Sequence, residues 1–297
     1  MSQDTDVPTG EGFTTSLKFD VTTADTSTAS AERVHFGQTI EAKNLQHLAS
    51  ATSSAKKVTL SFWVKSTITG TYAVAIYKGD QTARLVNATY TVSSADTWEH
   101  KTITFPGDTG GGGIDNDNGS GFQFDWFLIA GTGSTSGGAQ TTWANFAAAS
   151  WAGGHNVNFG SSTDNNYYIT GVQLEVGDQA TDFEHLPHDI QLQRCQRYFQ
   201  IIQYRYKVLT RWNNSNGNPL NQQDFMITMN HAPTITNTDP NSSTNRSFET
   251  STTTQYSGNL SYDGITENNT YIMGANSLTA GHTIYALNGV SVMDAEI

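Results

Sequence analysis

Four tryptophans have side chains that could bind a ligand: Trp63, Trp143, Trp151 and Trp212. An indole ring offers a flat apolar face on which a sugar ring can stack. The alternative is that these rings pack in the core or at a subunit contact, because tryptophan is highly buried on average. A glycan-binding surface that uses these residues is therefore one of two interpretations.

A glycine-rich loop at 106–120 carries candidate calcium ligands. Asp115 and Asp117 alternate with asparagines in the stretch DNDNG. Hard oxygen ligands on a loop suit Ca²⁺, but the stretch lacks the spacing and the final glutamate of an EF-hand. The alternative is that such residues beside glycine simply form turns. Calcium at Asp115 and Asp117 is the weak cofactor candidate of this sequence, and no other cofactor is expected.

The acidic residues and histidines form no recognisable catalytic motif. A glycoside hydrolase needs a pair of carboxylates, and the candidates are Asp125, Glu175, Asp182 and Glu184. The sequence does not show how far apart these carboxylates lie in space. The histidines of HLPH at 185–188 have loose metal-ligand spacing without a third ligand nearby. We therefore expect no enzymatic activity, with a polysaccharide hydrolase as the alternative.

Charge and cysteine content argue against several partner classes. The net charge is −12, which repels nucleic acid and anionic membranes. Cys195 is the single cysteine, so no intrachain disulfide can form. The amino-terminal segment MSQDTDVPTG is polar and unlike a signal peptide, and no apolar run is long enough to span a bilayer. We expect neither nucleic-acid binding nor membrane insertion.

Alternating apolar residues predict many short strands in residues 13–186. The clearest run is 58–64, where Val58, Leu60, Phe62 and Val64 share one face. In 166–176 the alternation assigns one face to Tyr168, Thr170, Val172, Leu174 and Val176. Further strands are expected at 71–77, 84–92, 98–105, 121–130 and 155–160, and a helical segment at 40–48. Loops rich in Gly, Asn and Asp separate the strands, which favours an all-β, jelly-roll β-sandwich.

The pattern changes after Pro187. Leu192, Cys195, Phe199 and Ile202 follow 3-4-3 spacing, and we call these four residues the seam. The seam predicts a short helical connector at 187–199, placed at a domain or subunit boundary. Period-2 alternation then returns and predicts a smaller β domain at 200–297, with a long loop at 237–259. Residues 1–12 are expected to be a flexible start.

Several segments together resemble the carboxy-terminal part of tail-fibre and related virion proteins of tailed bacteriophages. The matching stretches cover most of residues 10–200 and include FWVKS, TWEHKTITFPGD and GVQLEVGDQATDFEH, with a weaker match in MNHAPTIT and the closing MDAEI. The resemblance is specific in the combination of these stretches, since each alone would be weak.

The resemblance implies a jelly-roll module like those of carbohydrate-binding domains, in a homotrimer that contacts other virion proteins and a host surface glycan. It implies a virion location, with assembly in the host cytoplasm and exposure after lysis. A tail fibre, spike or receptor-binding tip is the expected function. A capsid-decorating fibre and a monomeric carbohydrate-binding module are the alternatives.

Overall fold

The computed structural model describes residues 1–200 with their side chains, and beyond them only the backbone of the strands β11 to β20. The chain divides into two compact units, Met1–Glu184 and His185–Ile297, and each is described by itself. Within the described residues, no helix has both the length and the apolar character needed to cross a bilayer.

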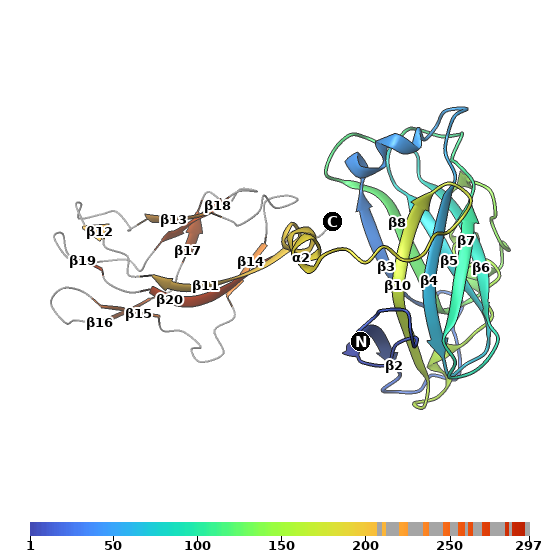
Figure 1. Ribbon diagram of the computed structural model, residues 1–297, viewed down its shortest axis with the longest axis horizontal. Helices are drawn as coiled ribbons and strands as arrows, with labels where there is room; N and C mark the ends of the chain where they lie inside the picture. Colours follow the sequence, from blue (N-terminus) through green and yellow to red (C-terminus); the bar gives the residue numbers. More distant parts are fainter. Residues whose placement is uncertain are drawn as a thin grey trace. The chain divides into compact units, whose positions relative to one another are not determined.

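Met1–Glu184 is an all-β, jelly-roll sandwich of two five-stranded antiparallel sheets (Figure 1). Sheet A has the order β1-β2-β10-β4-β7, and sheet B has the order β3-β8-β5-β6-β9. The strands of sheet A are β1 (Ser2–Asp4), β2 (Ser16–Asp20), β10 (Asn166–Val176), β4 (Val58–Ser66) and β7 (Glu99–Phe105). Those of sheet B are β3 (Arg33–Glu41), β8 (Ser120–Ala130), β5 (Gly70–Lys78), β6 (Arg84–Val92) and β9 (Ala144–Asn145).

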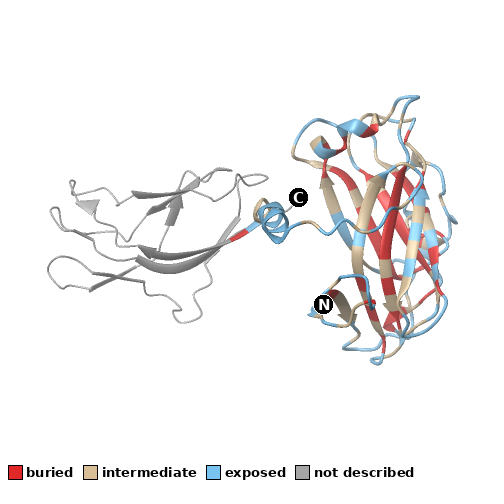
Figure 2. Cartoon of the chain, viewed as in Figure 1, coloured by how far each residue is buried: buried red, intermediate tan, exposed pale blue. Residues whose placement is uncertain are grey.

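The core lies between the two sheets, and the central strands carry most of its buried residues (Figure 2). The alternation predicted for β4 is confirmed, because Val58, Leu60, Phe62 and Val64 are at most 3% exposed. Thr59 on the outer side of β4 is also buried, and its hydroxyl donates to the Gly177 carbonyl oxygen at 2.9 Å. The chain after β10 therefore lies against part of the outer face of sheet A.

The face assigned to β10 was wrong. Tyr167 and Ile169 point inward, at 0% and 4% exposure, whereas Val172 and Val176 are exposed. The pairing with β4 shifts between Thr170 and Gln173, at a bulge where Gly171 has a φ of +60°. The extra residue of a bulge reverses the alternation, and Leu174 packs against the core beyond it.

Two further elements differ from expectation. The segment 155–160 is not a strand: it ends in the 3-10 helix η3 (Phe159–Ser161), and Asn158 caps that helix by accepting from the Gly160 N–H. Asn156 Oδ1 accepts from the Thr71 N–H at 2.9 Å, so a side chain satisfies this backbone donor in place of a neighbouring strand. The helical segment expected at 40–48 is the 3-10 helix η1 (Ala42–Leu48), because β3 extends to Glu41. Shorter helical elements are α1 (Thr132–Thr135) and η2 (Ala148–Ser150).

Residues 1–12 are not wholly the flexible start that was expected. Strand β1 pairs with β2, and the Lys18 ammonium lies 3.7 Å from the Asp4 carboxylate. Asp6 forms an ion pair with Lys65 and accepts a hydrogen bond from the Trp98 indole N–H at 2.9 Å. These contacts hold the amino-terminal segment on sheet A.

His185–Ile297 begins with helix α2 (His188–Gln196), followed by strand β11 (Phe199–Tyr206). The seam is therefore not one helical stripe: Leu192 and Cys195 lie on α2, whereas Phe199 and Ile202 belong to β11. The expectation of a long loop at 237–259 was also wrong, since β15 and β16 pair with each other within it. The remaining strands are β12 (Thr210–Arg211), β13 (Leu220–Asp224), β14 (Thr234–Asn237), β15 (Arg246–Glu249), β16 (Gln255–Gly258), β17 (Ser261–Asp263), β18 (Asn269–Met273), β19 (Thr283–Ile284) and β20 (Leu287–Asp294).

Replacing Phe62 with alanine should lower the free energy of unfolding by about 3–5 kcal/mol, because a fully buried ring is lost. The Phe62 ring contacts Tyr90 and Trp126, with centroids 5.1 Å and 5.9 Å away. Urea unfolding measures the change, with the exposed Thr102→Ala on neighbouring β7 as the control. A loss below about 1 kcal/mol for Phe62→Ala would contradict the assignment.

Candidate functional site

The segment between β8 and β10 packs on the outer face of sheet B. A small apolar cluster joins this segment to the sheet. It consists of Ala73, Ala75, Leu85, Phe127 and Ala152, and Phe146 and Trp151 pack against it. The Asn87 side chain on β6 donates to the Ser150 carbonyl oxygen at 2.6 Å, and the Ala73 N–H on β5 donates to His155 Nδ1 at 3.3 Å. Trp151 is thereby held against the sheet.

A buried carboxylate orients the Trp151 ring. Asp125 on β8 has a side chain that is 1% exposed, and its Oδ2 accepts from Trp151 Nε1 at 3.0 Å. Its Oδ1 accepts from Gln123 Nε2 at 2.9 Å and lies 3.7 Å from His35 Nε2. A hydrogen bond to a charged acceptor is stronger than a neutral one, so the indole has a defined orientation before any ligand arrives.

Gly37 allows β3 to run close to this carboxylate. It pairs with Asp125 across the β3–β8 ladder and is itself exposed. A Cβ atom on Gly37 would lie 2.4 Å from the Phe124 carbonyl oxygen and 2.9 Å from Asp125 Oδ1. No real side chain tolerates such distances, so glycine is required at this position.

Polar and aromatic groups surround the half-buried Trp151 ring. The Arg33 guanidinium carbon lies 4.9 Å from the ring centroid, in cation–π geometry. The His35 ring lies 5.5 Å away, and the Phe146 ring meets Trp151 edge-on at 5.3 Å. We call Trp151, Asp125, His35, Gln123 and Arg33 the Trp151 platform. A pre-oriented aromatic ring with hydrogen-bonding groups at its edge can stack and orient a sugar.

The structure does not bring the predicted tryptophans together. Trp63 lies on the outer side of sheet A, half-buried, with its ring 5.1 Å from that of His100. Trp151 lies on the outer side of the opposite sheet. Trp143 packs against the core and stacks on Phe122 at 5.5 Å. Trp212 lies outside the described residues.

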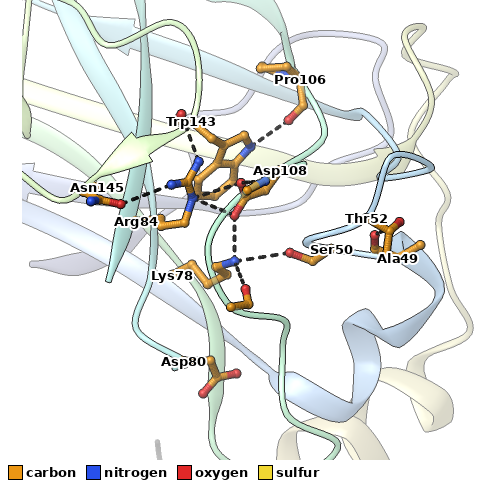
Figure 3. Close-up of polar contacts among 12 residues, drawn as sticks. Ala49, Ser50, Thr52, Lys78, Asp80, Arg84, Pro106, Asp108, Trp143 and Asn145 are labelled. Atoms are coloured by element: carbon orange, nitrogen blue, oxygen red, sulfur yellow. Dashed lines mark hydrogen bonds and ion pairs between the residues drawn. The ribbon is translucent and has the colours of Figure 1, made fainter. Parts of the chain in front are cut away.

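Trp143 belongs to a buried charged network (Figure 3). Its indole N–H donates to the Pro106 carbonyl oxygen at 2.7 Å, and its own carbonyl oxygen accepts from Arg84 at 3.0 Å. Arg84 and Lys78 both pair with Asp108, at 2.9 Å and 2.6 Å. These contacts give Trp143 a structural role in joining β5 and β6 to the 106–120 loop.

The same network supplies positive charge to the glycine-rich loop. The Lys78 ammonium is 0% exposed and donates to Asp108 Oδ2 and to the Gly112 carbonyl oxygen, each at 2.6 Å. The calcium candidates have other partners: Asp115 Oδ1 accepts from Gln81 at 2.8 Å, and Asp117 Oδ1 accepts from the Gly119 N–H at 2.9 Å. Within the described part of the chain, no group of three or more His, Cys, Asp or Glu side chains could hold a metal ion. Calcium at Asp115 and Asp117 stays a prediction.

Of the four candidate hydrolase carboxylates, Asp125 is separated from the other three, which lie along β10. Asp125 belongs to the outer face of sheet B, whereas Glu175 is on β10 of sheet A, where it accepts from the Thr181 hydroxyl at 2.5 Å and from the Thr181 N–H at 3.0 Å. Those hydrogen bonds hold the pKa of Glu175 below its ordinary value. The backbone of Asp182 and Glu184 is hydrogen-bonded to Gln173, also on β10.

The sequence pattern did not single out Arg33, His35 or Gln123. Only the pairing of β3 with β8 brings Arg33, His35 and Asp125 to one place. A charged residue within the aromatic strand FQFDWF was a usable signal, because an aspartate in such a strand needs nearby partners.

No family model matches this sequence, and no curated protein matches it. Among solved structures, the chain is similar to one described as "Family 16 Carbohydrate Binding Module-2". The sequences are 17% identical, the alignment covers 55% of this chain and 78% of that chain, and the TM-score is 0.26. A score this low does not indicate a shared function.

Acidification below pH 6.5 should destabilise the sandwich through His155. Burial holds the pKa of His155 below its ordinary value of 6.5. Nδ1 accepts from the Ala73 N–H and Nε2 contacts the Val157 carbonyl oxygen at 2.7 Å, an arrangement that suits the neutral ring. The unfolded chain takes up the proton first, so stability is present above pH 6.5 and falls below it, by at most about 1.4 kcal/mol per pH unit.

Urea unfolding between pH 7.5 and 5.5 measures this dependence. His155→Gln should flatten it, because glutamine can accept and donate in place of the ring but does not titrate. The exposed His100→Gln is the matched control and should leave the slope unchanged. Equal slopes in the wild type and His155→Gln would contradict the assignment.

Proposed function

We propose that this protein is a non-enzymatic virion structural protein, a tail fibre, spike or receptor-binding tip, whose sandwich contacts a glycan on the host cell surface. The observation that carries the glycan-binding part is the Trp151 indole, held by the buried Asp125 carboxylate beside His35 and Arg33. The resemblance of FWVKS, TWEHKTITFPGD and GVQLEVGDQATDFEH to tail-fibre proteins supports the virion part.

The separation of Asp125 from the other candidate carboxylates supports a binding rather than a catalytic function for the Trp151 platform. Retaining and inverting glycosidases both need two carboxyl groups flanking one bond, separated by about 5 to 10 Å. Asp125 and Glu175 belong to the outer faces of different sheets. A general acid also needs a raised pKa, whereas that of Glu175 is lowered.

Trp151→Ala should reduce glycan affinity at least about tenfold, which corresponds to about 1.4 kcal/mol, because the stacking surface is lost. The measurement is binding to a panel of immobilised bacterial surface oligosaccharides and polysaccharides. Trp63→Ala is the matched control: it removes a half-buried tryptophan from the opposite sheet and should leave affinity unchanged. Retained binding in Trp151→Ala, or shortening of the glycans by the wild type, would contradict the proposal.

Trimerisation completes the proposed fibre. Helix α2 has no buried residue, and Leu192 and Phe199 are 47% and 42% exposed. A helix of nine residues is only marginally stable in water unless it packs against something. We infer that the exposed apolar side chains at Leu192 and Phe199 contact other copies of this chain, which would also let weak glycan contacts add through avidity.

Light scattering should give a mass near three times 32.2 kDa at micromolar concentration. Leu192→Asp should shift the protein toward monomer, because it places a charge in the contact. Gln193→Asp adds the same charge to the neighbouring position of α2 and serves as the control. A monomeric wild type would exclude the trimer and favour a monomeric carbohydrate-binding module, which could use the same Trp151 platform.

A further inference from the structure

Almost every basic side chain of the sandwich has a carboxylate partner. The chain as a whole has 15 Lys and Arg against 27 Asp and Glu, so carboxylates are abundant. Ion pairs are formed by Lys18, Lys43, Lys57, Lys65, Lys78, Arg84 and Lys101. Among the lysines and arginines of Met1–Glu184, Arg33 and Lys56 take part in none of the described ion pairs. A basic side chain without a carboxylate is therefore unusual in the described ion pairs of the sandwich and is informative where it occurs.

Arg33 lies at the Trp151 platform. It is the first residue of β3 and pairs with Ala130 of β8, two positions before His35 on the same strand. The residue is exposed, and its guanidinium is placed 4.9 Å from the indole centroid. Stacking on the ring restrains this long side chain while leaving its N–H donors without a carboxylate.

We propose that the glycan bound by the Trp151 platform contains a sugar residue that bears a carboxylate, such as a hexuronate, and that Arg33 binds this group. The inference rests on the proposed function, because it concerns the same site. A planar guanidinium donates two parallel hydrogen bonds to a carboxylate, a geometry that a neutral sugar hydroxyl does not match. Because the guanidinium already lies over the indole, the sugar ring would pack against the part of the half-buried ring that Arg33 leaves uncovered.

The net charge restricts the ligand further. At −12, the protein repels a densely charged polyanion, but exposed charges are screened beyond a Debye length of about 8 Å at physiological ionic strength. A single guanidinium contact acts within that distance. The ligand that fits is an otherwise neutral glycan with isolated acidic residues.

Matched oligosaccharide pairs test this directly. Each glucuronate- or galacturonate-containing oligosaccharide is compared with the same molecule after reduction of its carboxyl groups to primary alcohols. The wild-type protein should bind the acidic member about tenfold or more tightly than the reduced one. Arg33→Gln should bring that ratio close to one, whereas Lys56→Gln, which removes the other unpaired basic side chain, should leave it unchanged. Thermal melting confirms that each variant is folded.

The outcomes separate this inference from the proposed function. Equal affinity of the wild type for both members of every pair, lost in Trp151→Ala, would overturn the acidic-sugar inference while supporting glycan binding at this site. A preference for the acidic member that survives in Arg33→Gln would overturn the assignment to Arg33. Absence of binding to any glycan would overturn both proposals.

Discussion

Aromatic rings packed between the two sheets form the contact on which the rest of the sandwich depends. Phe62 extends from sheet A and meets Tyr90 and Trp126 of sheet B nearly edge-on, at interplanar angles of 84° and 89°. The Tyr90 and Tyr167 hydroxyls lie 2.8 Å apart and join the two sheets through a buried hydrogen bond. Burial raises the pKa of both phenols, which keeps them neutral. The two hydroxyl groups therefore join the sheets without adding charge to the core.

Two buried carboxylates outside that core attach loops to sheet B in different ways. Asp108 is neutralised by two cations, Lys78 and Arg84, and this network attaches the glycine-rich loop. Asp125 instead accepts from the neutral donors of Gln123 and Trp151, with His35 farther away at 3.7 Å. Removing one partner from a buried ion pair leaves an uncompensated charge, so the first arrangement is primarily structural. The second orients a half-buried aromatic ring, which makes it the better candidate for binding.

The distribution of charge links this site to the proposed adsorption function. Acidic residues outnumber basic ones across the whole chain, and most cations of the sandwich are held in ion pairs. Long-range attraction to anionic surfaces is therefore not expected, and the proposed recognition relies on short-range contacts at the Trp151 platform. Weak contacts of this kind become effective when several copies of the protein bind together. The proposed trimer contact at α2 and the proposed glycan site therefore support each other.

The sequence by itself determined the all-β class and most strand positions, since a period of two is a local property of the chain. It was sufficient for the inward face of β4, where alternation is uninterrupted. It failed on β10, because a bulge at Gly171 reverses the alternation and depends on pairing with β4. The tryptophans illustrate the same limit. Their residue type indicated a binding surface. Only the tertiary structure shows that Trp143 belongs to a buried network and that Trp151 contacts Asp125 and Arg33. Those partners come from strands far apart in sequence, and strand pairing is decided by packing between sheets rather than by local pattern.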